Sequence, residues 1–176
     1  MRDSGVLECE AAAHIASLMA AAARTAPKTR GRDNIRVIAV DDAESKQRLC
    51  AKMTEISRRE NQPSMARDAG CIAAAPAVIA IGVASNPADL DCGYCGEKNC
   101  DAQRATRGVC AFNSIDLGIA ACSAAATASQ LHADSRVMYS VGRACLELKL
   151  FPDDVRQALG IPVSITGKSP YFDRAV

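Results

Sequence analysis

The amino-acid sequence predicts an α+β fold in which helices pack around one sheet and a cysteine-rich loop is inserted. Three observations predict it. Helical and strand-like segments follow each other without the regular alternation of a doubly wound parallel sheet. The run 77–83 is apolar at every position, as expected of a strand buried on both faces. Three of the nine cysteines fall within the stretch CGYCGEKNC, which is too irregular for a helix or a strand.

The size and charge of the chain limit the classes of protein it can belong to. Its 176 residues are 49% hydrophobic, so we expect one domain over 1–176 with a cysteine-rich insertion at about 88–111. Lys and Arg total 21 against 20 Asp and Glu, and the chain has no Trp, three Tyr and three Phe. Such a chain offers no basic surface and few stacking rings. We therefore expect neither a nucleic acid nor a membrane as a partner.

The first element is expected to be a helix over residues 4–24. Strong helix formers fill this segment, and Ala26-Pro27 ends it. Its Ala-rich part is similar to the core of a secretory signal, but Glu8 and Glu10 precede it where a signal carries basic residues. We therefore expect a soluble, cytoplasmic protein, in which the cysteines favour metal binding or buried thiols over disulfides.

A strand, a helix and a buried strand are expected next. The β-branched run 34–40 predicts a strand, which the pair Asp41-Asp42 closes before capping a helix over 43–59. A short helical piece near 65–69 then leads to the apolar run already described. Because that run is buried on both faces, it should be the central strand of the sheet.

The carboxyl-terminal half begins with an Ala-rich helix. Asn113 is expected to be its N-cap, with Asp116 as the charged partner three residues later, and the helix should reach about His132. The remaining expected elements are short: a strand near 136–141, a helix near 142–150, a short helix after Pro152 and an extended piece near 161–167.

The cysteine-rich stretch predicts a metal site with four thiolate ligands. Two, four and nine residues separate the successive members of this set: Cys92, Cys95, Cys100 and Cys110. Three close thiols and a more distant fourth suit a cubane 4Fe-4S cluster, which needs four thiolates converging on one small object. Gly93 and Gly96 would let backbone amides approach the sulfides of such a cluster.

Several alternatives remain open at this point. Structural zinc also takes four cysteines, although its ligands usually come as two separated pairs. A redox dithiol would use only Cys92 and Cys95, and cysteines can also serve as small hydrophobic residues. The fourth ligand could be Cys122 on the following helix, but Cys110 closes a shorter loop and is preferred.

The other cysteines are expected to be structural. They lie in apolar or helical surroundings, where a free thiol is usually buried: Cys9, Cys50, Cys71 and Cys145.

Two resemblances extend this interpretation. CGYCGEKNC, followed by Cys110 and FNSIDLGIA, resembles the ferredoxin-domain-containing proteins of unknown function found in bacteria and archaea, and the likeness covers nearly the whole chain. The stretch ARTAPKTRGRDNIRVIAVDDAESKQRL and the order of the carboxyl-terminal elements resemble the nitroreductase-like fold. The first resemblance implies an iron-sulfur protein. The second implies a nitroreductase-like sheet flanked by helices, a bound flavin mononucleotide (FMN) and a homodimer, although the basic pair that opens such proteins is absent here.

Charged residues outside the cysteine stretch supply weaker candidates. The basic loop TAPKTRGRD either holds an anion such as the flavin phosphate or is simply solvated, and its candidate residues are Lys28, Arg30 and Arg32. A second polar cluster in GKSPYFDR either contacts a ligand or docks the carboxyl tail, and contains Lys168, Tyr171 and Arg174.

The sequence therefore predicts a redox protein that passes single electrons between its cluster and a partner protein or a bound flavin. Basic residues near the cluster are expected to tune its potential and to help docking: Lys98, Arg104 and Arg107. The competing class is a non-catalytic module in which zinc or a cluster staples a loop used for protein interaction.

Overall fold

The computed structural model of the protein describes residues 1–106 and 108–171. Its four strands form one antiparallel sheet in the order β1-β2-β4-β3. The strands are β1 (Ile35–Val40), β2 (Ala77–Ala84), β3 (Asp134–Ser135) and β4 (Val155–Ser164). The helices are α1 (Ser4–Thr25), the 3-10 turn η1 (Thr29–Gly31), α2 (Ala43–Glu60), α3 (Pro63–Ala74), α4 (Cys100–Thr106), α5 (Ala111–Gln130) and α6 (Tyr139–Glu147). This arrangement confirms the predicted α+β class.

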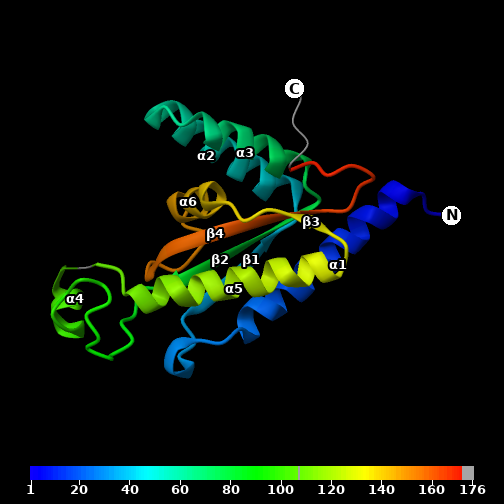
Figure 1. The fold of residues 1–176 in the computed structure, drawn as a ribbon. Coiled ribbons are helices and arrows are strands. Elements are labelled where there is room, and N and C mark those ends of the chain that lie inside the picture. Colours follow the sequence, from blue (N-terminus) through cyan, green and yellow to red (C-terminus); the bar gives the residue numbers. More distant parts are fainter. Residues whose placement is uncertain (107, 172–176) are drawn as a thin grey trace.

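Helices cover both faces of the sheet (Figure 1). The pair α1 and α5 packs on one face, and α2, α3 and α6 pack on the other. Along β2, Ile79 and Ile81 face the first layer, whereas Val78 and Ala80 face the second. Every residue of β2 is buried, as predicted for a central strand.

The first helix begins at its expected residue and ends one residue later than expected. Asp3 caps α1 by accepting a hydrogen bond from the Val6 amide (3.0 Å), and Ala26 ends the helix before Pro27. By length and composition α1 could cross a membrane. One face of α1, which includes Ile15 and Met19, is buried in the core against α5. A bent pair of α4 and α5 passes the same test only when taken together across residue 107.

In the middle of the chain, two segments contain more helix than expected. The short helical piece near 65–69 is part of α3, which begins with Pro63 at a position where proline costs no hydrogen bond. The insertion is not irregular throughout, because α4 lies inside it. The side chain of Asn99 accepts a hydrogen bond from the Ala102 amide (2.9 Å) and so satisfies one of the amides at the start of α4.

The last third of the chain differs most from expectation. The segment predicted as a strand near 136–141 makes only an isolated bridge at Met138, and α6 begins at Tyr139, three residues before its predicted start. The predicted short helix after Pro152 is absent from this described segment. In its place β4 runs for ten residues and pairs with β2 along its length.

The register of the sheet explains how β4 tolerates two strand-breaking residues. The N–H and C=O of Gly160 bond Met138, so Gly160 and Pro162 turn their backbone polar groups away from β2. On that side Gly160 pairs with Met138 and Ser164 pairs with Asp134 of β3. Pro162 lies between these two positions of β4, where its missing N–H costs no bond to β2. A Cβ on Gly160 would lie 2.1 Å from Cγ1 of Val141, so α6 packs here directly on the backbone of β4.

Candidate functional site

The residues between β2 and α5 form a lobe at one end of the molecule, beyond the start of α5 (Figure 1). We call residues 88–110 the cysteine lobe. It contains the whole motif CGYCGEKNC and α4, and it ends at Cys110, the N-cap residue of α5.

All four predicted ligands lie in this lobe as free thiols. Cys92 is exposed, Cys95 and Cys100 are half-buried, and Cys110 is buried. Cys100 is the first residue of α4, so the loop of three thiols leads directly into a helix.

The two glycines of the motif serve a turn. Gly93 and Gly96 have φ values of 72° and 86°, a conformation that residues with a Cβ adopt rarely. The Gly96 amide donates a hydrogen bond to the Gly93 carbonyl oxygen (2.9 Å), which closes the turn around Cys95. Glycine at these two positions is therefore explained by the left-handed backbone of the turn. The Gly96 amide already donates within the loop.

Two contacts hold the thiol loop in place. The Asp91 carboxylate accepts a hydrogen bond from the Cys100 amide (2.8 Å), which ties the two ends of the loop together. The ring of Tyr94 stacks on the ring of Phe112 in the first turn of α5, with 5.6 Å between ring centroids and 10° between planes. Since Phe112 is two residues from Cys110, this stack places the CGYC turn beside the start of α5.

The donor set fits a thiolate-bound group in its chemistry. Four unpaired thiols within one lobe are the ligands that iron-sulfur clusters and structural zinc use. Within residues 1–106 and 108–171, no three His, Cys, Asp or Glu side chains are gathered closely enough to hold a metal ion. Metal binding is coupled to folding, and a group held by these four thiols would have to draw them closer together as it binds.

The two candidates for the fourth ligand, Cys110 and Cys122, lie at different distances from the thiol loop. Cys122 is exposed and lies twelve residues further along α5 than Cys110. At the helical rise per residue this is a displacement of about 18 Å. The loop thiols that neighbour the start of α5 are therefore much closer in the fold to Cys110.

The remaining cysteines differ from one another in exposure. Cys145 is buried, and burial raises the pKa of its thiol to about 12, so it stays protonated in the core. Burial also raises the pKa of Cys50, whose thiol donates to the Ala69 carbonyl oxygen (3.4 Å). Cys71 is half-buried, but Cys9 is exposed on α1, contrary to the burial expected for it.

The basic loop is engaged with protein groups. Lys28 donates through Nζ to the carbonyl oxygens of Arg24 and Ala26 (2.9 Å to Ala26), at the carboxyl end of α1. Arg30 and Arg32 both reach the start of the cysteine lobe, where they donate to main-chain oxygens and to a carboxylate.

Asn113 and Asp116 have roles other than the predicted capping. The N-cap of α5 is Cys110, and Asn113 is buried in the first turn, where its Nδ2 donates to the Asn86 carbonyl oxygen (3.0 Å). Asp116 is also buried, and its Oδ1 accepts hydrogen bonds from the amide (3.0 Å) and the hydroxyl (2.9 Å) of Thr29. The expectation fails because the helix starts earlier, which turns both side chains inward.

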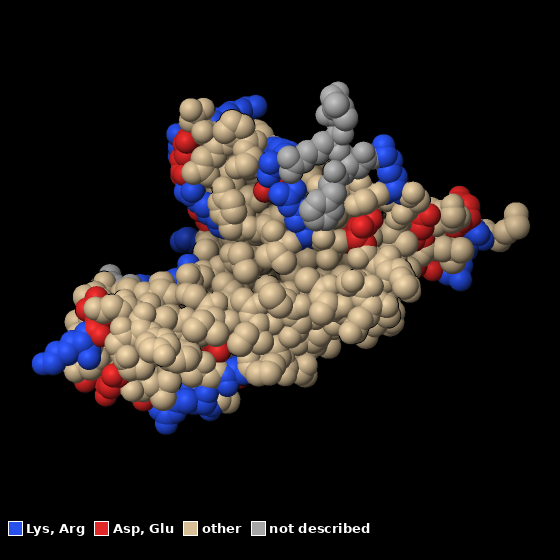
Figure 2. All heavy atoms as spheres, in the orientation of Figure 1, with Lys and Arg blue, Asp and Glu red and all other residues tan. Residues whose placement is uncertain are grey.

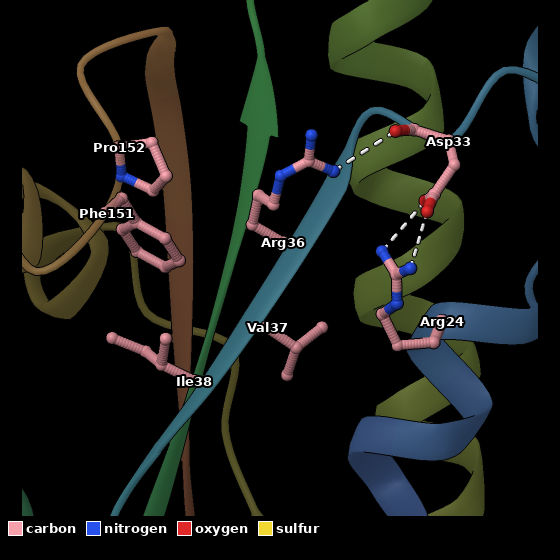
Figure 3. A pocket seen from close by; sticks show the side chains of 7 residues that line it. All are labelled: Arg24, Asp33, Arg36, Val37, Ile38, Phe151 and Pro152. Carbon is pink, nitrogen blue, oxygen red and sulfur yellow. Dashed lines mark hydrogen bonds and ion pairs between the residues drawn. The ribbon is translucent and has the colours of Figure 1, made fainter.

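A hollow of about 480 Å³ lies along the outer edge of β1 (Figure 3). Arg24 closes one side through a paired ion contact with Asp33 (2.5 and 2.8 Å), and Phe151 and Pro152 line the other side. Arg36 points from the strand into the space between them and donates to the Asp33 carbonyl oxygen (3.1 Å). None of the predicted site residues lines this hollow.

The other charged candidates are partly described. Lys98 is exposed on the lobe, and Arg104 pairs with Asp101 (2.7 Å). Tyr171 is buried, and its carbonyl oxygen accepts a hydrogen bond from Arg136 (3.4 Å). Two further candidates lie outside the described residues: Arg107 and Arg174.

Sequence reasoning missed the residues that hold the lobe. The main ones are Thr29, Asp89, Asp91, Tyr94 and Phe112. Apart from the Asp91 bond within the thiol loop, their contacts join segments far apart in the chain, so no local pattern marks them. The single available signal was the crowding of Asp, Asn and Gly around the cysteines, which is typical of left-handed turns.

Comparison with known proteins agrees with these features. A family model described as "Uncharacterized protein containing a ferredoxin domain" matches residues 106–174, a range that includes Cys110 but not residues 92–100. An uncharacterized protein of Archaeoglobus fulgidus is 38% identical over 169 residues, which cover 91% of this chain and 90% of that protein.

Solved structures show the same fold at low identity. A nitroreductase with bound FMN from Desulfitobacterium hafniense is 18% identical, with a TM-score of 0.61, and the match covers 99% of this chain and 85% of that one. A nitroreductase with bound FMN from Bacteroides fragilis is 12% identical, with a TM-score of 0.63 and coverage of 93% and 82%. The NADPH:FMN oxidoreductase of Vibrio harveyi, complexed with NAD+, is 12% identical, with a TM-score of 0.59 and coverage of 92% and 63%. The sheet and its helices are thus nitroreductase-like.

Proposed function

The chain belongs to the family of uncharacterized proteins that contain a ferredoxin domain, and from this premise we propose that it holds a 4Fe-4S cluster and transfers single electrons. Family and fold together indicate a redox role. The proposed ligands are Cys92, Cys95, Cys100 and Cys110. The proposed acceptor or donor is a partner protein or a bound flavin.

The observation that carries this proposal is the packing of the thiol loop against α5. The Tyr94–Phe112 stack brings the CGYC turn to the helix end whose N-cap is Cys110. The loop that carries three thiols therefore lies beside the start of the helix whose N-cap carries the fourth. Two separated pairs, which structural zinc usually takes, are not present in this arrangement.

The chain's own residues would bind the cluster and limit its contact with water. When bound, a 4Fe-4S cluster accepts or donates one electron at a potential set by its surroundings. The buried Cys110 would anchor the cluster on the protein side, and the exposed Cys92 would leave the outer side open to a partner. A cluster exposed on one side would favour electron transfer to a partner protein over chemistry on a small substrate.

Metal analysis of anaerobically purified protein tests the proposal. We expect about four iron and four acid-labile sulfide per chain, as a cubane cluster requires. A colourless protein that carries stoichiometric zinc would instead support the non-catalytic module that zinc staples together. Both metals are measured in the same sample, so the two results cannot be confused.

FMN is the second candidate cofactor, because the fold is shared with FMN-binding nitroreductases. In this proposal the flavin would pair electrons that the cluster delivers one at a time. The phosphate would lie near Lys28, Arg30 and Arg32, which would have to exchange part of their present protein contacts for it. A yellow fluorescent chromophore released on denaturation supports the flavin, and its absence from anaerobically purified protein counts against it.

We also propose a homodimer whose interface is the outer face of α5. Asp116 is the single charged residue of this helix and is buried, while Ile115, Ile119 and Cys122 are exposed. Figure 2 shows a broad surface without Lys, Arg, Asp or Glu along α5. Burying such an apolar face against a second copy of the chain would lower the free energy of the protein. Small residues such as Gly118 would allow the two copies of α5 to approach each other closely.

The oligomeric state tests this surface. Ile119→Glu is expected to shift the protein from dimer to monomer in light scattering, because it buries a charge in the proposed interface. Val137→Glu, which replaces an apolar residue of comparable exposure outside α5, is the matched control and should remain dimeric. A monomeric parent protein, or a dimeric Ile119→Glu variant, would overturn the proposal.

A further inference from the structure

The start of the cysteine lobe is held by three arginines from two parts of the chain. Arg30 donates through Nη1 to the carbonyl oxygens of Ala88 (3.1 Å) and Asp89 (3.0 Å). Arg32 donates through Nη1 to the Pro87 carbonyl oxygen (2.9 Å) and to Oδ2 of Asp89 (2.8 Å). Arg104 of α4 donates to the other carboxylate oxygen of Asp89. We call these contacts the arginine clasp.

The clasp lies where the backbone adopts an unfavourable left-handed conformation. Asp89 and Asp91 have φ values of 54° and 46°, and Arg30 itself has a φ of 56°. Non-glycine residues adopt this left-handed conformation at a cost, so they keep it where surrounding contacts require it. The bonds from Arg32 and Arg104 also hold the pKa of Asp89 below its usual value, which keeps its carboxylate charged.

The clasp is itself fixed to α5. The loop that carries Arg30 and Arg32 is joined to the buried Asp116 through the amide and hydroxyl of Thr29. Cys110 lies at the start of that same helix. A continuous path of contacts therefore runs from α5 through the basic loop to Asp89 and the entrance of the thiol loop.

We infer that Arg30, Arg32 and Arg104 are positioning residues for the proposed cluster site. By holding residues 87–89, they keep the entrance of the thiol loop at a fixed place relative to Cys110. The chain then loses less conformational freedom when four thiols close on one cluster. This inference rests on the proposed cluster, and it gives the two arginines of the basic loop a role other than holding an anion.

The test removes the carboxylate at the centre of the clasp. Asp89→Asn keeps the shape of the side chain but loses its charge, and Asp89→Ala loses both charge and hydrogen bonds. The matched control is Asp101→Asn, which removes the same charge from the same lobe and from the other partner of Arg104. Arg32→Met provides a second variant on the opposite side of the contact.

Two measurements are made on each variant. Amide hydrogen exchange of the metal-free protein should become faster across residues 90–106 in Asp89→Ala and Arg32→Met, and should stay unchanged in Asp101→Asn. Anaerobically reconstituted Asp89→Ala should lose iron to a chelator about ten-fold faster than the parent, the size of effect seen when partners that orient metal ligands are removed. Asp89→Asn should lie between the two.

The possible results separate the clasp from the cluster. Unchanged exchange in Asp89→Ala would overturn the clasp whether or not iron binds. Faster exchange with an unchanged rate of iron loss would overturn the positioning role. Loss of a flavin from Arg32→Met, with iron retained, would assign that arginine to an anion site instead. A parent protein that takes up no iron would defeat the proposed function while the exchange data still test the clasp.

Discussion

Replacing Cys110 by serine is expected to abolish stable iron binding, whereas Cys122→Ser is expected to leave the iron content unchanged. A ligand that is removed should cost more than the roughly 100-fold upper range reported for partners that only orient a ligand. Cys110 caps α5 beside the thiol loop, and Cys122 lies exposed about 18 Å further along the helix. The serine variants of Cys92, Cys95 and Cys100 should behave like that of Cys110.

A control is needed because Cys110 is buried and its replacement could simply destabilise the fold. Cys145→Ser places the same hydroxyl at another buried thiol, far from the cysteine lobe in the chain. It should lower the unfolding temperature and still bind iron. Iron loss in Cys122→Ser together with retention in Cys110→Ser would assign the fourth ligand to α5's outer face and refute the assignment made here.

Gly142→Ala is expected to destabilise the protein by about 3 kcal/mol or more, because overpacking against backbone cannot be relieved by a side-chain rotation. A Cβ on Gly142 would lie 1.8 Å from the carbonyl oxygen and 2.2 Å from the carbonyl carbon of Ala158. Residue 142 lies in α6, and Ala158 lies in β4. The helix would have to move off the sheet, and urea unfolding would report the loss.

The control is the same substitution at a helical glycine with open space around it. A Cβ on Gly70 of α3, which lies outside the proposed dimer interface, meets no atom within 4 Å. Gly70→Ala should therefore stabilise the protein by about 0.5–1 kcal/mol through the higher helix propensity of alanine. Equal stability of the Gly142 and Gly70 variants would contradict the described contact between α6 and β4.

Segments with a strong local pattern could be predicted from the sequence. Residues close together in the chain predict each of these segments: the helix formers of α1, the Asp42 cap of α2 and the apolar run of β2. Asp42 indeed accepts from the Ser45 amide (2.8 Å). Local signals were sufficient there because tertiary contacts agree with them.

Segments decided by tertiary contacts could not be predicted. Gly160 and Pro162 argue against a strand by composition, yet β4 forms because α6 needs the glycine and the gap beside β3 accepts the proline. Asn113 is a residue type typical of N-caps, but its side chain is buried and donates to the Asn86 carbonyl oxygen instead. In each case a residue's partner lies far away in the chain, where a single sequence gives no sign of it.

The candidate site divides in the same way. The spacing of the cysteines was sufficient to propose four ligands. The contacts that place them, from Tyr94 to Phe112 and from Arg32 to Asp89, appear only in the folded chain. The basic loop illustrates the difference most clearly. Its composition leaves open whether the arginines hold an anion or are solvated, and their bonds to residues 87–89 appear only in the folded chain.

We propose that the cysteine lobe holds a 4Fe-4S cluster that exchanges single electrons. Electron paramagnetic resonance of the anaerobically purified protein, recorded before and after chemical reduction, distinguishes such a cluster from zinc. We expect a signal that arises on reduction and integrates to about one unpaired electron per cluster, as one-electron reduction of a cubane requires. Zinc in the lobe and no signal in either state would refute the cluster.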